Sequence, residues 1–180
     1  MKLDYDAQHL NIDAFARAQG RIDDSRSLSH FGRLLQEAHG ITSSTTVHFT
    51  AHGTTRPDGA AGEQVWLVLT GDVALPQICQ RCLGAVDVPV AFKREFRFVA
   101  TEDLAASEDE ASEEDVLALS RDFHLMDLIE DELLMALPVV PKHEVCPEPV
   151  KLQVADPDFV DEASEKPNPF AVLEQLKKKG

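Results

Sequence analysis

The middle of the chain alternates between apolar and polar residues with a period of two. Residues 45–52 follow this pattern, and residues 86–98 repeat it, as expected for strands with one buried face. Residues 65–69 are apolar throughout, which is typical of a strand buried on both faces. Short links join these segments, and short links favour antiparallel pairing because parallel strands need a long crossover connection. The sequence therefore predicts an antiparallel β-sheet or a partial barrel.

Glycine and proline punctuate the predicted strands. Gly71-Asp72 predicts a turn or bulge before a further strand at residues 73–78. Pro76 within that strand predicts an edge position, because proline has no N–H to donate to a neighbouring strand. Residues 116–119 are expected to return to the sheet as a short strand.

Apolar residues have helical spacing in two segments, one before the predicted strands in the sequence and one after most of them. A helix is expected from Leu28 to Ala38, with Ser27 as its N-cap and Gly40 as its left-handed stop. A stronger amphipathic helix is expected from Leu125 to Leu137, before Pro138. The fold class is thus α+β, with two or three helices flanking the sheet. The acids of the second helix are expected on its solvent face; they are Asp127, Glu130, Asp131 and Glu132.

The chain is strongly acidic, and its acids are unevenly spread. It carries 32 Asp and Glu against 17 Lys and Arg, a formal net charge of −15. This balance disfavours broad electrostatic adhesion to nucleic acid and favours a basic protein as partner. Residues 101–115 hold eight acids and no base, which predicts a solvated acidic loop; the alternative is a segment that attracts a basic partner. Without a secretory signal or an apolar stretch of membrane-spanning length, the expected location is the cytoplasm, with no membrane partner.

Three parts are expected along the 180 residues. Residues 1–146 should form a single α+β domain that includes the acidic loop. Residues 147–167 are rich in proline and acids and predict an extended tether. Residues 168–180 predict a short amphipathic helix, because asparagine can cap, proline suits the first turn and the apolar residues share one side. This helix either docks in a groove of a partner or folds back onto its own domain. Its candidate partner-binding residues are Asn168, Pro169, Phe170, Leu173 and Leu176.

The most specific local signal is the pair Cys79 and Cys82. Two thiolates at this spacing in a tight turn can bind one zinc ion, and His143 with Cys146 would complete a four-ligand structural site. The alternative is a purely structural role, in which the cysteines are small residues in a strand-to-strand turn and are unrelated to His143 and Cys146. Thiol–disulfide exchange is a third interpretation, although redox CxxC motifs usually begin a helix and a strand follows here. The expected cofactor is thus none or one structural zinc.

Three segments resemble the YceD family, also called large ribosomal RNA subunit accumulation proteins. Residues 79–83 (CQRCL), residues 127–143 followed by Cys146, and residues 168–177 (NPFAVLEQLK) look like that family's motifs, in the same order and at similar spacing. The resemblance implies a role in the synthesis, processing or stability of 23S ribosomal RNA, with no known enzymatic activity.

Three hypotheses for the mode of action remain open. The first is a non-catalytic factor that contacts a basic ribosomal protein or an rRNA-processing factor, with no small-molecule substrate and no catalytic residues, since none of the common catalytic motifs occurs. The second is direct binding of 23S rRNA precursor by a local basic patch. The third is a thiol–disulfide enzyme. The candidate RNA contacts are Arg81, Lys93, Arg94 and Arg97.

Overall fold

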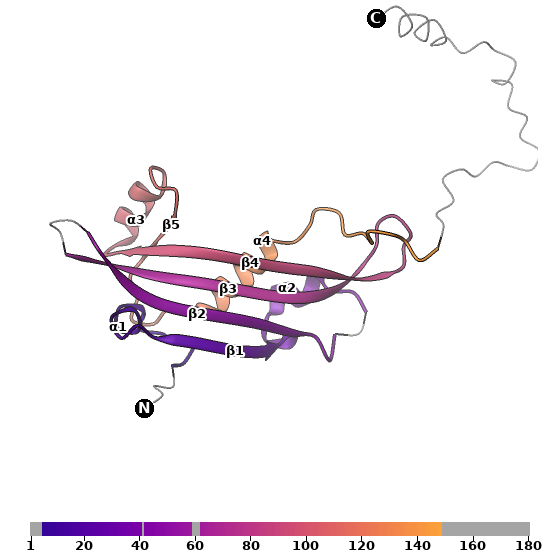
Figure 1. Cartoon of the computed structure of the whole chain (residues 1–180), viewed down its shortest axis with the longest axis horizontal. Helices are drawn as coiled ribbons and strands as arrows, with labels where there is room; N and C mark the ends of the chain where they lie inside the picture. Colours follow the sequence, from indigo (N-terminus) through magenta and orange to yellow (C-terminus); the bar gives the residue numbers. More distant parts are fainter. Residues whose placement is uncertain (1–4, 41, 59–61, 149–180) are drawn as a thin grey trace, which may run out of the picture. The chain divides into compact units, whose positions relative to one another are not determined.

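A computed structural model describes residues 5–40, 42–58 and 62–148. Within these residues, five strands form one open sheet in the order β1-β2-β3-β4-β5, the same as their order along the chain (Figure 1). Strands β1 to β4 pair antiparallel, and β5 pairs parallel to β4. The strand bounds are Arg21–Ser27 (β1), Thr46–Pro57 (β2), Glu63–Ile78 (β3), Ala85–Val99 (β4) and Asp115–Ala118 (β5).

Short helices accompany the sheet. Helices α1, α2 and α4 supply buried side chains to the main core, and α4 crosses behind the sheet in the view of Figure 1. No helix in the described part of the chain is long and apolar enough to span a membrane. The helix bounds are Ile12–Arg17 (α1), Leu28–His30 (the 3₁₀ helix η1), Gly32–Glu37 (α2), Glu102–Asp109 (α3) and Leu125–Met135 (α4).

The core lies between the helices and one face of the sheet. Every second residue of β2, β3 and β4 points into it, so the alternation in the sequence is the alternation of the two sheet faces. Helix α4 adds Leu125, Ile129 and Leu133, which are fully buried and four residues apart. The predicted α+β class with an antiparallel, unclosed sheet is confirmed.

Strand β3 is continuous, so the prediction of a turn or bulge at Gly71-Asp72 is wrong. Gly71 pairs with Phe49 on one side and with Phe92 on the other. A Cβ on Gly71 would lie 2.4 Å from Cε1 of Phe92. The glycine is therefore explained by the aromatic ring that lies over it, because a side chain and that ring cannot share the space.

Pro76 lies in β3 where one side of the strand has lost its partner. Pairing with β2 extends only as far as His48 and Asp72, whereas pairing with β4 continues to Ile78. The carbonyl of Pro76 accepts a hydrogen bond from the backbone N–H of His39 at 2.7 Å. The missing proline N–H thus faces a local edge, as predicted.

The helix predicted from Leu28 to Ala38 is divided into η1 and α2. Ser27 does cap η1, since its side chain accepts from the backbone N–H of Ser29. The division falls at Phe31, whose extended backbone at φ −117° and ψ 84° ends η1 and begins α2. Gly40 adopts the predicted positive φ, +99°, but it is not the stop, because the extended backbone of Ala38 at φ −82° and ψ 142° already ends α2.

The acidic segment at residues 101–115 is not a loop throughout, because its first half forms α3. Thr101 caps this helix by accepting from the N–H of Leu104, and Glu102 and Asp103 lie in the first turn, where the helix dipole favours acids. Arg97 of β4 binds two acids of the segment, Glu108 and Glu114. The like-charge repulsion that favoured a loop is offset by this buried guanidinium.

The described residues up to Glu148 belong to one compact unit. The predicted tether from residue 149 onward and the predicted C-terminal helix, with its five partner-binding residues, lie outside the described residues. Those assignments stay predictions.

Candidate metal centre

The turn between β3 and β4 places two cysteines on a tight knuckle, which we define as residues 79–84. The backbone N–H of Leu83 donates to the carbonyl of Cys79, and the N–H of Cys79 donates to the carbonyl of Gly84, both at 2.8 Å. Leu83 takes the left-handed conformation at φ +60°, which reverses the chain within a few residues. The turn thereby directs the side chains of Cys79 and Cys82 to one side.

The segment after α4 brings the other two predicted ligands to the knuckle. The N–H of Gln80 donates to the carbonyl of Pro141 at 2.9 Å. The Arg81 guanidinium donates to the carbonyls of His143 and Glu144 at 2.8 and 3.1 Å. Prolines at 138 and 141 restrict the backbone conformation of this segment. A few hydrogen bonds are therefore enough to fix its position.

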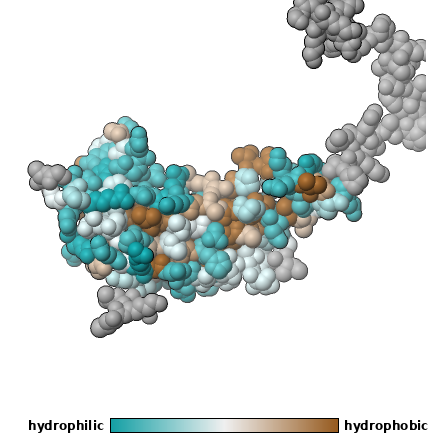
Figure 2. All heavy atoms as spheres, in the orientation of Figure 1, coloured by the Kyte–Doolittle hydropathy of each residue, from teal (hydrophilic) through white to brown (hydrophobic). Residues whose placement is uncertain are grey.

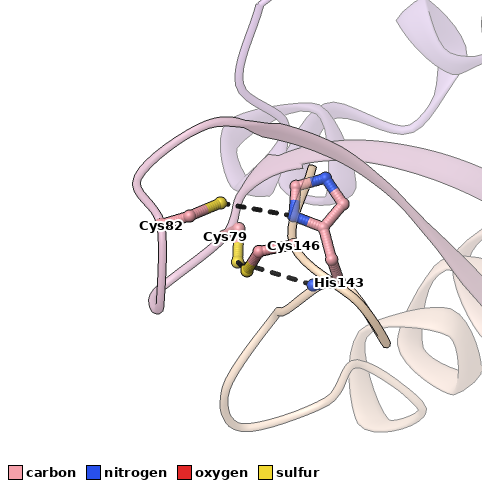
Figure 3. Close-up of side chains that lie close together, drawn as sticks. All are labelled: Cys79, Cys82, His143 and Cys146. Atoms are coloured by element: carbon pink, nitrogen blue, oxygen red, sulfur yellow. Dashed lines mark hydrogen bonds between the residues drawn. The ribbon is translucent and has the colours of Figure 1, made fainter. Parts of the chain in front are cut away.

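The four predicted ligands converge as Figure 3 shows. Their ligand atoms all lie within 4.8 Å of one another. Cys79 Sγ is 3.9 Å from Cys146 Sγ, and Cys82 Sγ is 3.4 Å from His143 Nδ1. For comparison, zinc–sulfur bonds of about 2.3 Å in a tetrahedron place two ligand atoms about 3.8 Å apart. The cluster therefore has the size of a tetrahedral site.

The knuckle also stabilises thiolate at Cys79, which is fully buried. Desolvation raises the pKa of this thiol, but backbone N–H groups of Cys82, His143 and Arg81 outweigh it and lower the pKa to about 5. Arg81 Nε donates to Cys146 Sγ at 3.0 Å. Thiolate is the form that binds metal, so these groups favour that form at Cys79. The backbone N–H of Gly84 lowers the pKa of Cys82, but burial and the sulfurs of Cys146 and Cys79 outweigh it and raise that pKa.

The sequence features agree with one protein family. A sequence model described as "Large ribosomal RNA subunit accumulation protein YceD" matches residues 67–177. The chain belongs to the YceD family. A relative of that name from Haemophilus influenzae is 29% identical over 176 residues, which cover 94% of this chain and 96% of the relative. No solved structure matches the chain.

In this YceD-family chain two of the four acids in the 127–143 motif are structural, contrary to the prediction that all four lie on the solvent face of α4. Glu130 and Glu132 are each only 7% exposed. Glu130 accepts the backbone N–H groups of Arg33 and Leu34, at 2.7 and 3.0 Å, and so caps α2 from a distance. Sequence periodicity missed this role because a cap supplied by another helix leaves no local signal.

The second buried acid of the motif connects α4 to the sheet. Glu132 Oε2 accepts from Arg94 Nε at 3.2 Å. Burial raises the pKa of Glu132, and the attraction of Arg94 opposes that rise. Arg94 points to the helical face of β4 because it shares the alternation phase of Phe96, which places it toward α4.

The four candidate RNA-contacting residues do not form one exposed basic patch. Arg97 is 7% exposed and bonded to Glu108, Glu114 and Ser112. Arg94 is paired with Glu132, and Arg81 is bonded at the knuckle. Lys93 is exposed on β4. Three of the four cations thus serve contacts within the protein.

A substitution of Arg97 should loosen α3. Changing Arg97 to Met keeps the length of the side chain but removes its hydrogen bonds to Glu108, Glu114 and Ser112. We expect a loss of about 1–2 kcal/mol in unfolding free energy, because the two carboxylates can still be hydrated. Hydrogen exchange should accelerate at the amides of α3 and little elsewhere.

The matched control for this experiment is Arg56→Met. Arg56 stacks on Trp66 at 4.0 Å and pairs with Glu95, but its side chain is 39% exposed. We expect a loss below about 1 kcal/mol there. Equal effects of the two substitutions, with α3 exchange unchanged, would contradict the anchoring role of Arg97.

A second group of possible ligands lies at His9, Asp122 and His124. All three are exposed, and His9 Nδ1 lies 2.7 Å from Asp122 Oδ1. This hydrogen bond raises the pKa of His9 and lowers that of Asp122. A surface ion pair between the N-terminal segment and the residues before α4 is enough to explain this group.

Proposed function

We propose that this protein supports accumulation of the large-subunit ribosomal RNA without catalysis, by contacting a basic ribosomal protein or an rRNA-processing factor. Family membership supports the process, since both the matching family description and the relative's name concern accumulation of that RNA. The mode of action rests on the surface around the knuckle.

The observation that carries the proposal is a set of exposed apolar side chains on the knuckle and on the segment that follows α4, which we call the apolar end. Such residues mark contact surfaces when they gather in one place. Figure 2 shows hydrophobic atoms along the segment that follows α4. The apolar end consists of Leu83 (75% exposed), Val139 (99%), Val140 (54%) and Val145 (84%).

A shallow pocket lies beside these residues. It has a volume of about 330 Å³ and lies between the knuckle and the segment after α4. Val139 and Pro138 line it together with Glu37 and His39. An apolar rim with an acid in the pocket suits a partner that presents a basic or long amphipathic side chain.

The charge distribution favours a protein partner over naked RNA. The net charge is −15, and Arg81, Arg94 and Arg97 are engaged in internal contacts. A basic protein is attracted by the same charge that repels phosphates. A thiol enzyme is disfavoured because Cys79 is fully buried and the knuckle leads into β4 rather than into a helix.

A charge placed in the apolar end should separate folding from function. We expect Val139→Glu to fold normally, because this side chain is 99% exposed, and to fail to restore 23S rRNA levels in a host lacking its own YceD-family gene. The ratio of 23S to 16S rRNA measures the effect, and circular dichroism verifies the fold. A basic protein that co-purifies with the wild type at moderate salt should be lost.

The matched control is Leu104→Glu, which changes an apolar residue that is 40% exposed on α3. We expect this variant to restore 23S rRNA. Full complementation by Val139→Glu would refute the apolar end as the contact surface. Tight binding of purified protein to naked 23S precursor, abolished by Lys93→Glu, would instead support direct RNA binding.

A further inference from the structure

We propose that Cys79, Cys82, His143 and Cys146 bind one structural Zn²⁺ ion. Three sulfurs and one imidazole nitrogen form a set that zinc prefers, and four protein ligands leave no open position for a substrate. This site is independent of the role in rRNA accumulation, and elemental analysis tests it without reference to that role.

The distances fit a shared metal better than the alternatives. Cys79 Sγ and Cys146 Sγ are 3.9 Å apart, close to the edge of a zinc tetrahedron and almost twice the length of a disulfide bond of about 2.0 Å. Cys82 Sγ and His143 Nδ1 are 3.4 Å apart, so the nitrogen nearer the sulfurs is Nδ1. We therefore infer coordination through His143 Nδ1.

Arg81 completes the site from outside the ligand set. Three thiolates, a neutral imidazole and Zn²⁺ together carry one negative charge. The Arg81 guanidinium donates to Cys146 Sγ at 3.0 Å and to the carbonyls of His143 and Glu144. It thus balances that charge and orients the two late ligands, as outer groups around metal sites do. Arg81 is a positioning residue here, not a ligand.

The physical consequence of the ion would be a crosslink across a large sequence separation. Cys79 and Cys146 are 67 positions apart. The segment that carries Val139, Val140 and Val145 has those residues exposed, so hydrophobic burial contributes little to its position. Metal bonds would supply that restraint, since binding free energy at a structural site stabilises the folded chain.

The first test is the metal content of the untagged, full-length protein, purified without chelators. We expect about one zinc per chain by mass spectrometry of the elements, and less than about a tenth of that in Cys82→Ser and in Cys146→Ser. Replacement by Co²⁺ should give the strong visible absorption of tetrahedral thiolate coordination. Cys82→Ser tests the knuckle and Cys146→Ser tests the late segment.

The second test keeps every ligand and changes Arg81 to Met. We expect this variant to retain zinc but to bind it about 10-fold more weakly in competition with a chromophoric chelator. Hydrogen exchange should be faster at residues 138–148 when the wild type is stripped of metal, with the strands unchanged. These readouts do not depend on a cysteine variant that folds poorly.

Three results would overturn the proposal. The first is wild-type protein that neither contains zinc nor competes for added zinc with a chelator of micromolar affinity. The second is zinc content that persists undiminished in both cysteine variants, which would indicate binding elsewhere. The third is a metal-free native protein with a disulfide between Cys79 and Cys146, detected by mass spectrometry of its unreduced proteolytic peptides.

Discussion

Replacement of Glu130 by Ala should lower the free energy of unfolding by about 3 kcal/mol. The Glu130 side chain is 10% exposed, and its Oε1 accepts the backbone N–H groups of Arg33 and Leu34 while Oε2 accepts from Arg33 Nε. Phe31, at the N-cap of α2, makes no side-chain cap with the described residues. Alanine would leave buried N–H groups without an acceptor, and each costs about 1–3 kcal/mol. Urea denaturation followed by Trp66 fluorescence measures the loss.

Two controls make the Glu130 result specific. Glu130→Gln keeps a carbonyl oxygen that can accept the N–H groups, so we expect it to cost about half as much. Asp131→Ala removes a neighbouring acid that also pairs with Arg33 but is 51% exposed, so we expect a loss below about 1 kcal/mol. If Asp131→Ala costs as much as Glu130→Ala, the ion pair with Arg33 matters and the cap does not.

Substitution of Gly53 by Ala should destabilise the protein strongly although it adds only one methyl group. Gly53 lies in β2 directly under α1, and a Cβ there would lie 2.8 Å from Cα and 2.9 Å from N of Ala16. Because these are backbone atoms, the whole of α1 must move to make room. We expect a loss of about 3 kcal/mol, the upper end of ordinary overpacking, and a drop of roughly 6–12 °C in thermal midpoint.

The matched control is Gly71→Ala in the neighbouring strand. A Cβ at this position would lie 2.4 Å from Phe92 Cε1, but its close contacts are with that side chain alone. Phe92 is only partly buried, so its ring can turn away, and we expect a loss of about 1 kcal/mol or less. Shortening Phe92 to Leu should remove this cost, whereas shortening Phe15 to Leu should not rescue Gly53→Ala. Equal losses of unfolding free energy in Gly53→Ala and Gly71→Ala would show that α1 moves as easily as the ring of Phe92, and would contradict this prediction.

The sheet could be predicted because its information is local. Alternation at 86–98 and the fully apolar run at 65–69 each describe one strand and its faces. The prediction of a turn at Gly71 is wrong because the reason for this glycine is not local. The ring of Phe92 on the next strand occupies the space of a side chain, and the sequence of one strand does not show which residues lie beside it. The parallel pairing of β5 with β4 was likewise beyond a reading by local pattern.

The positions of the acidic and basic side chains were even harder to predict, because they too depend on tertiary neighbours. Glu130 and Arg97 are both residues of a charged type, and residue type alone predicted solvent exposure for Glu130 and RNA contact for Arg97. Glu130 bonds to the backbone of Arg33, which is 97 positions away, and Arg97 bonds to Glu114, which is 17 positions away. Burial of a paired charge depends on such tertiary contacts. By contrast, the cysteine and histidine spacings carried enough chemistry to select four residues that the fold brings together.

The identity of strand order and chain order has a consequence for the time course of folding. Each strand of the sheet can pair with the one made just before it, so assembly can follow synthesis from the ribosome without waiting for distant sequence. The helical layer cannot do so, because α2 needs Glu130, which is made 97 positions after Arg33. We expect the nascent chain to hold a formed sheet with an exposed apolar face until α4 is complete, and that interval is when it is most open to aggregation.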